Sequence, residues 1–231
     1  MADRAEPERM ADFFDSRAQG YEAHMERSVA SFDRFYAAIA SPVPKTQERL
    51  SILDVGCGTG LELEAILSRA PNAVVTGIDV SARMLDKLRE RYERRSEQLH
   101  LIQGSYLEVP LGESRYDYAV AVMTLHHLLP TRKLELYRRI RRALKREGGY
   151  VEGDWVVSPE EEEGYRSRYE ELVLTLSRER AIEREAPDEG SYHIDVPLSL
   201  ETETRLLVEA GYNTVDVIWQ GERNDVYVAR G

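Results

Sequence analysis

The chain has 231 residues and a formal net charge of −11 at pH 7, and 42% of its residues are hydrophobic. This composition supports a folded core, and the acidic balance argues against a broad polyphosphate-binding surface. The single cysteine, Cys57, excludes a disulfide within the chain. The N-terminus shows no secretory signal, and no apolar run approaches the roughly 20 residues that a membrane span needs. We therefore expect a cytoplasmic protein without membrane contact.

Residues 1–44 are expected to form an N-terminal helical cap. Apolar residues recur there at spacings of three, four and seven, as one buried helix face requires. They are Phe13, Phe14, Tyr21, Met25, Phe32, Phe35, Tyr36 and Ile39. Ser41-Pro42-Val43-Pro44 ends the region because proline cannot continue a helix.

Residues 45–157 alternate short apolar runs with longer amphipathic segments. The runs, expected as strands, are Ser51–Val55, Ala73–Ile78, Leu99–Gln103, Tyr116–Val122 and Gly149–Val157. The segments between them, expected as helices, are Leu61–Arg69, Ser81–Ser96 and Thr131–Lys145. This alternation predicts an α/β fold with a doubly wound sheet of mainly parallel strands.

Residues 158–198 are expected to form a helical insertion before the last helix. Pro159 and the four glutamates after it predict a helix start, and Tyr165, Tyr169, Leu172 and Leu176 give that helix an apolar face. The insertion would lie over the carboxyl edge of the sheet, either as a lid or as a solvated connection. Residues 199–231 then supply a helix near Leu200–Ala210 and a closing hairpin of Thr214–Trp219 and Asp225–Ala229.

Three glycines, Gly56, Gly58 and Gly60, follow the first expected strand. Glycine allows positive φ and close approach of a ligand, and this end of a parallel strand opens onto the ligand crevice of α/β sheets. Leu61 stands where a dinucleotide fingerprint needs its third glycine, and no Gly-Lys-Ser/Thr of a phosphate loop follows. Asp54, two residues before the loop, suits a ligand that presents an ammonium group.

Four motifs in order carry a family resemblance. They are Asp54–Gly60; Gly77-Ile78-Asp79-Val80-Ser81 with Met84; Tyr116–Val120 running into Leu125-His126-His127-Leu128; and Leu144–Gly149. Over roughly residues 45–157 the chain resembles the class I S-adenosylmethionine-dependent methyltransferases. The resemblance implies a Rossmann-like, seven-stranded mixed sheet with the last strand antiparallel. It also implies S-adenosyl-L-methionine as cofactor and S-adenosyl-L-homocysteine as product.

The resemblance assigns cofactor contacts residue by residue. The loop of Gly56, Cys57, Gly58 and Gly60 would pass the methionine part of the cofactor, and Asp54 would hold its amino group. Asp79 would accept hydrogen bonds from both ribose hydroxyls, because a carboxylate offers two oxygens; a turn or helix-capping role is the alternative.

Further cofactor contacts follow from the same resemblance. Val80 and Met84 would flank the adenine, although Met84 could simply be core. Ser105 stands where the family often has an acidic residue for the adenine amino group, and Tyr106 is beside it. Met123 would lie near the cofactor, and Tyr21 either covers its methionine end or belongs to the core.

A hydroxyl or amine acceptor also needs a base. His126 and His127 follow the fourth strand, and Asp154 on the next strand could orient one of them. Some small-molecule O-methyltransferases of the family are similar here, so His126 with Asp154 is the expected catalytic pair; helix capping is the alternative. Trp155, Tyr192 and His193 could line an acceptor pocket, with His193 otherwise an exposed loop residue. The five histidines are scattered, so we predict no metal site.

The expected function is methyl transfer to an oxygen or nitrogen of a small-molecule acceptor. A basic run on one helix comprises Arg132, Lys133, Arg138, Arg139, Arg141, Arg142, Lys145 and Arg146. We interpret it as a solvated outer helix, so a nucleic-acid partner is not expected. The alternatives are a methyltransferase that acts on RNA or protein and a non-catalytic module of the same fold. A dinucleotide oxidoreductase is disfavoured by the glycine spacing, and a homodimer is left open.

Overall fold

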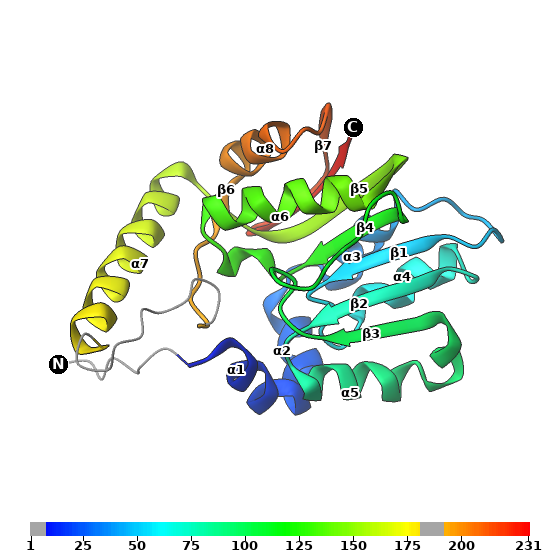
Figure 1. Ribbon diagram of the computed structural model, residues 1–231, viewed down its shortest axis with the longest axis horizontal. Coiled ribbons are helices and arrows are strands. Elements are labelled where there is room, and N and C mark those ends of the chain that lie inside the picture. Colours follow the sequence, from blue (N-terminus) through cyan, green and yellow to red (C-terminus); the bar gives the residue numbers. More distant parts are fainter. Residues whose placement is uncertain (1–7, 181–191) are drawn as a thin grey trace.

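A mixed sheet with strand order β3-β2-β1-β4-β5-β8-β7 organises the computed structural model, which describes residues 8–180 and 192–231 (Figure 1). The strands are β1 (Ser51–Val55), β2 (Val74–Asp79), β3 (Leu99–Gln103), β4 (Tyr116–Val122), β5 (Leu144–Val157), β7 (Thr214–Gln220) and β8 (Asn224–Arg230). Strands β1 to β5 pair in parallel, and β8 is antiparallel to both β5 and β7. The expected sheet is confirmed; an unpredicted two-residue strand, β6 (Leu198–Ser199), pairs with β5.

The helices lie close to their predicted ranges. The N-terminal ones are α1 (Met10–Arg17), α2 (Tyr21–Ser28) and α3 (Phe32–Ala40), and the others are α4 (Leu61–Arg69), α5 (Ala82–Arg91), α6 (Pro130–Ala143), α7 (Pro159–Arg180) and α8 (Leu200–Glu209). Short 3-10 helices cover Ala18–Gly20, Glu93–Gln98 and Leu125–His127. Within the described ranges, no helix combines the length and apolar character that a membrane crossing requires.

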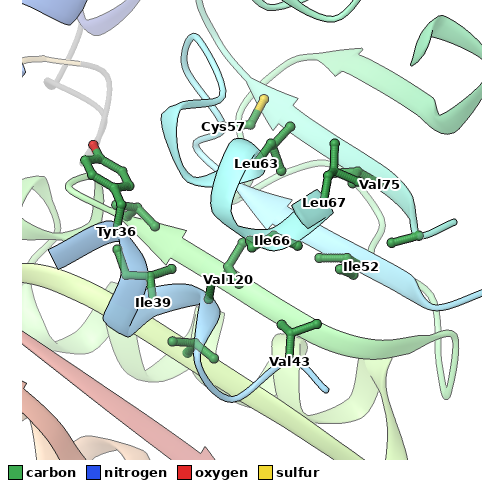
Figure 2. Packing of buried hydrophobic residues seen from close by; sticks show 14 of the residues in the cluster. Tyr36, Ile39, Val43, Ile52, Cys57, Leu63, Ile66, Leu67, Val75 and Val120 are labelled. Carbon is green, nitrogen blue, oxygen red and sulfur yellow. The ribbon is translucent and has the colours of Figure 1, made fainter. Parts of the chain in front are cut away.

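The central strands of the sheet are buried on both faces, since successive residues point to opposite sides and residues on both sides are buried. Ile52 of β1 belongs to one hydrophobic cluster with residues of α3 and α4 and of the loop after α3, among them Ile39, Ile66 and Val43 (Figure 2). Leu53, the next residue, packs into the second cluster with α6 and α8. Helices therefore cover both faces, and the carboxyl ends of the parallel strands are left to form a site.

Strand β5 begins earlier than predicted, at Leu144 rather than Gly149. The pairing with β4 jumps from Tyr116↔Leu144 to Tyr118↔Gly149, so the extra residues are absorbed in an irregularity of the ladder. A Cβ at Gly148 would lie 3.0 Å from the Lys145 carbonyl oxygen, which explains a glycine in this tight segment. The glycine pair thus marks a bulge inside the strand and not the strand's start.

Lys133 contradicts the interpretation of the basic run as wholly solvated. Its side chain is completely buried, and its ammonium group pairs with Glu203 of α8 and lies 3.7 Å from Oε1 of Glu152 on β5. The Tyr137 hydroxyl lies 2.7 Å from both carboxylates. Burial raises the pKa of Glu152 to about 8, against the opposing effect of Lys133. Lys133 lies on the face of α6 that packs on the sheet. The prediction of a solvated side chain, which rested on its charge alone, is therefore wrong for this residue.

Helix α7 begins at Pro159 as predicted and extends away from the sheet (Figure 1). Near its start, Glu162 accepts hydrogen bonds from the Ser199 backbone at 2.7 Å and the Thr202 hydroxyl at 3.0 Å. The Tyr165 ring lies 5.4 Å from the Trp155 ring. The side chain of Leu176 lies outside the described residues, and a lid role for this insertion stays a prediction.

Candidate active site

The glycine loop after β1 requires its glycines for backbone geometry. Gly56, Gly58 and Gly60 have φ values of 70°, 46° and 73°, in the region that L side chains rarely adopt. A Cβ at Gly56 would lie 2.2 Å from the Thr124 hydroxyl oxygen, whereas one at Gly58 would meet only the Tyr21 ring at 3.9 Å. Gly58 therefore leaves open space beside the backbone, as a bound ligand needs.

A first cavity lies at the carboxyl ends of β1, β2 and β4, with about 570 Å³ of empty space, its mouth included. Its lining includes nine predicted cofactor residues: Tyr21, Gly56, Gly58, Asp79, Val80, Met84, Ser105, Tyr106 and Met123. Met10, Phe14, Leu107, Thr124, His127 and Leu128 complete it. Asp54, Cys57 and Gly60 are buried and do not line it.

Asp79 accepts hydrogen bonds through both carboxylate oxygens, from the Gly58 and Ser81 backbones, each at 2.8 Å. Ser81, and not Asp79, caps α5, because its hydroxyl accepts from the Met84 backbone at 3.1 Å. Each Asp79 oxygen keeps a further lone pair for a ligand hydroxyl. Burial raises the pKa of Asp79 to about 6 despite the backbone donors.

The Ser105–Val109 loop forms the wall predicted for adenine. Ser105 accepts from the Leu107 backbone at 3.2 Å, and the Tyr106 hydroxyl lies 3.4 Å from the Thr124 carbonyl. Arg139 of α6 donates to three carbonyl oxygens of this loop, at Tyr106, Leu107 and Val109. Arg139 therefore fixes the loop from behind, a role that its place in the basic run did not indicate.

Helix α1 closes the first cavity over α5. Asp15 accepts from the Ser81 hydroxyl at 2.5 Å and from the Arg83 backbone at 3.1 Å. This docking brings Met10 and Phe14 into the cavity lining. The sequence indicated a helical cap, but it gave no sign that Asp15 would anchor it.

A second, wider cavity adjoins the first, with about 1620 Å³ of empty space, its mouth included. Phe14, Tyr21, Met123 and His127 line both cavities. The second is also lined by His126, Trp155, His193, Asp195, Arg17, Arg223 and Asn224, among others. Tyr192 is buried and does not line it.

Met123 lies on the shared wall with a left-handed backbone, at φ 50°. Its N–H donates to the Gly153 carbonyl at 2.8 Å, and its sulfur accepts from the Asn224 amide at 3.1 Å. A non-glycine residue held there costs on the order of 1–3 kcal/mol, and such strain clusters at functional sites.

His126 is held by Asp154, which is completely buried in the carboxyl-terminal part of β5. The Asp154 Oδ2 accepts from the Leu125 and His126 backbones, each at 2.9 Å, while Oδ1 lies 2.5 Å from Nδ1 of His126. Burial alone would lower the pKa of His126, but the Asp154 carboxylate outweighs it and raises that pKa. Burial opposes ionisation of Asp154 as well, yet His126 lowers the pKa of Asp154 to about 2.

His127 and His193 meet at Asp195, which the sequence did not single out. Asp195 Oδ1 lies 3.1 Å from Nδ1 of His127, 3.8 Å from Nε2 of His193 and 3.9 Å from Nε2 of His126. Burial lowers the pKa of His127 to about 4, so its imidazole is neutral near pH 7. His193 stacks on Phe13 at 3.4 Å and lines the second cavity, so the expectation of an exposed loop residue is wrong.

Ligand atoms of His126, His127 and Asp195 all lie within 4.8 Å of one another, close enough to share a metal ion. The sequence indicated no such convergence, because Asp195 lies far along the chain. Pairing of the Glu8–Arg9 segment with Tyr192 and His193 brings it there: Arg9 bridges Tyr192, and the His193 backbone donates to the Glu8 carbonyl at 2.9 Å. The prediction that the protein needs no metal stays a prediction.

Residues 52–148 match the family model described as a methyltransferase domain. A protein of Geobacillus sp. (strain WCH70) described as an uncharacterized methyltransferase is 25% identical over 206 residues, which cover 89% of this chain and 87% of the relative. An O-methyltransferase of Penicillium expansum is 37% identical over 83 residues, 35% of this chain and only 30% of that protein.

The solved complex of DhpI with SAH shares the fold, with a TM-score of 0.67 at 16% identity over 95% of this chain and 94% of that one. The matched domain contains the glycine loop after β1 and the acidic residue at the end of β2. The sheet order agrees with the fold expected for such a domain. Residues 52–148 therefore carry a methyltransferase domain, and over most of its length the chain resembles the class I S-adenosylmethionine-dependent methyltransferases.

Proposed function

We propose that the protein transfers a methyl group from S-adenosylmethionine to an oxygen or nitrogen of a small molecule held in the second cavity. The observation that carries this proposal is the wall that the two cavities share, made by Phe14, Tyr21, Met123 and His127. A donor in one cavity and an acceptor in the other meet at this wall, so positioning supplies much of the rate.

The first cavity fits the cofactor. Gly58 leaves room that a Cβ would fill, and Asp79 keeps a lone pair on each oxygen for the ribose hydroxyls. The Asp54 carboxyl accepts no hydrogen bond from an N–H or O–H donor among the described residues, which leaves it available to an ammonium group. When bound, the cofactor supplies an electrophilic methyl group on a sulfonium centre.

We assign His126 as the base and Asp154 as the residue that positions it. Asp154 accepts a hydrogen bond from the N–H at Nδ1, so the free lone pair of the neutral ring is on Nε2. His126 lines the second cavity, where the acceptor would bind. In its neutral form His126 takes the proton that the acceptor loses as its new bond to carbon forms. The resulting imidazolium is stabilised by the Asp154 carboxylate.

The lining of the second cavity supports a small acceptor with an aromatic or apolar body and a polar reactive group. Phe13, Phe14, Tyr21 and Trp155 supply flat apolar surface, while the histidines and Asp195 supply polar contacts. One relative is described as an O-methyltransferase, which favours an oxygen acceptor.

Action on RNA or protein has weaker support. Its only support is the basic run, which was expected on one helix, but Lys145 and Arg146 lie on β5 and not on α6. Lys133 is buried, and Arg138 pairs with Glu209 at 3.2 Å. Arg139 is engaged by loop carbonyls. If the run did bind RNA, neutralising Arg138, Arg139, Arg141 and Arg142 would abolish that binding.

Calorimetric titration with S-adenosylmethionine and S-adenosylhomocysteine tests the proposal. We expect micromolar binding to the wild type, loss of binding in Asp79→Ala, and no change in the control Asp86→Ala, an exposed carboxyl on α5. A screen of phenols, hydroxy acids and amines for S-adenosylhomocysteine release then identifies the acceptor. A folded wild type that binds neither ligand would refute the enzyme and favour the non-catalytic module.

A further inference from the structure

Two carboxyl groups lie buried together behind the glycine loop. Asp54 at the end of β1 is 1% exposed, and Glu62 in the first turn of α4 is 5% exposed. Their carboxyl groups lie within hydrogen-bond reach of each other, and no other group among the described residues donates a hydrogen bond to either oxygen of Asp54 or to Oε1 of Glu62. Two carboxylates cannot both ionise in such a place, so a proton must lie between them.

The charged neighbours do not neutralise this pair. Asp79 at the end of β2 adds negative charge, and the one cation that acts on Glu62 in the described part of the chain is Arg91. Arg91 is engaged at the surface by Glu22 at 2.9 Å and Glu64 at 3.2 Å. The Asp54–Glu62 pair therefore lacks a partner cation of its own.

The remaining titratable groups around the pair are neutral. Tyr21 and Tyr36 of the N-terminal helices, Cys57 of the loop and Tyr92 after α5 face it, and burial raises the pKa of each. They contribute no positive charge at any pH where the protein is folded.

We propose that Glu62 and Asp54 together form the binding site for the ammonium group of the cofactor, with Glu62 supplying the second carboxyl group. This inference rests on the proposed function. The pair accepts the N–H donors that it lacks in the free protein, and the incoming cation favours loss of the shared proton. Helix stabilisation does not explain the burial of Glu62, since Glu64 also lies in the first turn with a side chain that is 78% exposed.

Ligands with and without the ammonium group separate this role from a structural one. S-Adenosylhomocysteine carries the ammonium group, whereas methylthioadenosine keeps the adenosine and the sulfur but lacks the amino acid. In Glu62→Gln we expect affinity for S-adenosylhomocysteine to fall at least about tenfold, as loss of one charge-assisted hydrogen bond implies, with methylthioadenosine unchanged. Glu64→Gln, the matched control on the same turn, should leave both affinities unchanged.

The pH dependence of the wild type gives a second test that needs no variant. Protonation of the pair removes its negative charge, so affinity for S-adenosylhomocysteine should fall more steeply than affinity for methylthioadenosine as the pH is lowered. Asp79 titrates in both complexes, so it cancels in the ratio of the two affinities.

The outcomes distinguish this inference from the proposed function. Equal losses for both ligands in Glu62→Gln, no loss for either, or a ratio independent of pH would overturn the ammonium site while leaving the methyltransferase intact. If neither ligand binds the folded wild type, the proposed function itself fails.

Discussion

Replacing Asp154 with asparagine tests the assignment of the base most directly. The asparagine carbonyl oxygen can still accept from the Leu125 and His126 backbones, as Oδ2 does now at 2.9 Å. Its amide group then faces Nδ1 of His126 and the Trp155 N–H, which donates to Oδ1 at 2.7 Å. The amide can only donate to Nδ1, so the ring must carry its proton on Nε2, where the base needs a free lone pair.

The size of the effect follows from the electrostatics of the pair. Lowering the pKa of Asp154 from 3.8 to about 2 in the folded protein corresponds to an interaction on the order of 2 kcal/mol. Loss of general-base catalysis costs about 10²–10⁴ in rate. We expect Asp154→Asn to lower kcat within that range, with cofactor affinity unchanged, since Asp154 does not line the first cavity.

The pH dependence of the rate shows in which direction Asp154 shifts the pKa of His126. The raised pKa of His126 means that its neutral form accumulates only above the ordinary value of 6.5. The rising limb of the wild-type rate should therefore lie above pH 6.5, and in Asp154→Asn it should move below, because burial then outweighs the weaker attraction of Asp195.

The assay combines the rate of S-adenosylhomocysteine formation, with the best acceptor from the screen, and nitrogen NMR of the imidazole rings. The control is His127→Gln, which removes the neighbouring imidazole and leaves the His126–Asp154 pair intact. A wild-type rate in Asp154→Asn, or an unshifted limb with His126 still protonated on Nδ1, would refute the reasoning.

Three further predictions concern the cofactor, the core and the metal. Gly58→Ala should weaken S-adenosylmethionine binding at least about tenfold, because a side chain at its φ of 46° is strained by about 1–2 kcal/mol and enters the cavity. Calorimetry should show no change in the control Gly164→Ala. Equal affinities in Gly58→Ala and the wild type would contradict a role of Gly58 in cofactor binding. Lys133→Met should lower the free energy of unfolding by about 3–5 kcal/mol, because it leaves the buried carboxylates of Glu152 and Glu203 without a cation. The control Lys145→Met, at a half-exposed ion pair, should lower it by at most about 1 kcal/mol in urea titrations. Similar losses in the two variants would argue against a stabilising role of the buried ion pair. Prolonged treatment with a chelator should leave methyl transfer unchanged, since Asp154 already orients His126, and recovery of a lost rate by added zinc would instead make His126, His127 and Asp195 a metal site.

Local patterns in the sequence sufficed for the sheet and for much of the first cavity. The central parallel strands β1, β2 and β4 are largely buried on both faces and therefore appear as short apolar runs. The carboxyl ends of β1 and β2 place Gly58 and Asp79 at one edge of the sheet. These residues could be placed together from the sequence because strand–helix alternation predicts parallel neighbouring strands, whose carboxyl ends meet at the same edge of the sheet.

The acceptor side was not predictable in the same way. Asp195 meets His126 and His127 because the chain beyond the insertion pairs with residues 8–9 and because the Val196 N–H donates to the His126 carbonyl at 2.6 Å. No periodicity in the sequence signals such contacts. Glu62 was hidden for another reason: acidic residues are ordinary in the first turn of a helix, and only burial sets it apart from Glu64.

Glu152 and Asp154 show where residue type stops being informative. They lie two positions apart on β5, so they point to the same face of the sheet, and both are completely buried. The pKa of Glu152 is raised to about 8, since desolvation dominates despite Lys133, while the pKa of Asp154 is lowered to about 2 by His126 and its backbone donors. One carboxyl group thus serves the core, and the other holds His126, the proposed base. The difference comes from His126, which of these two carboxyl groups pairs with Asp154 alone and whose position relative to β5 exists only in the folded chain.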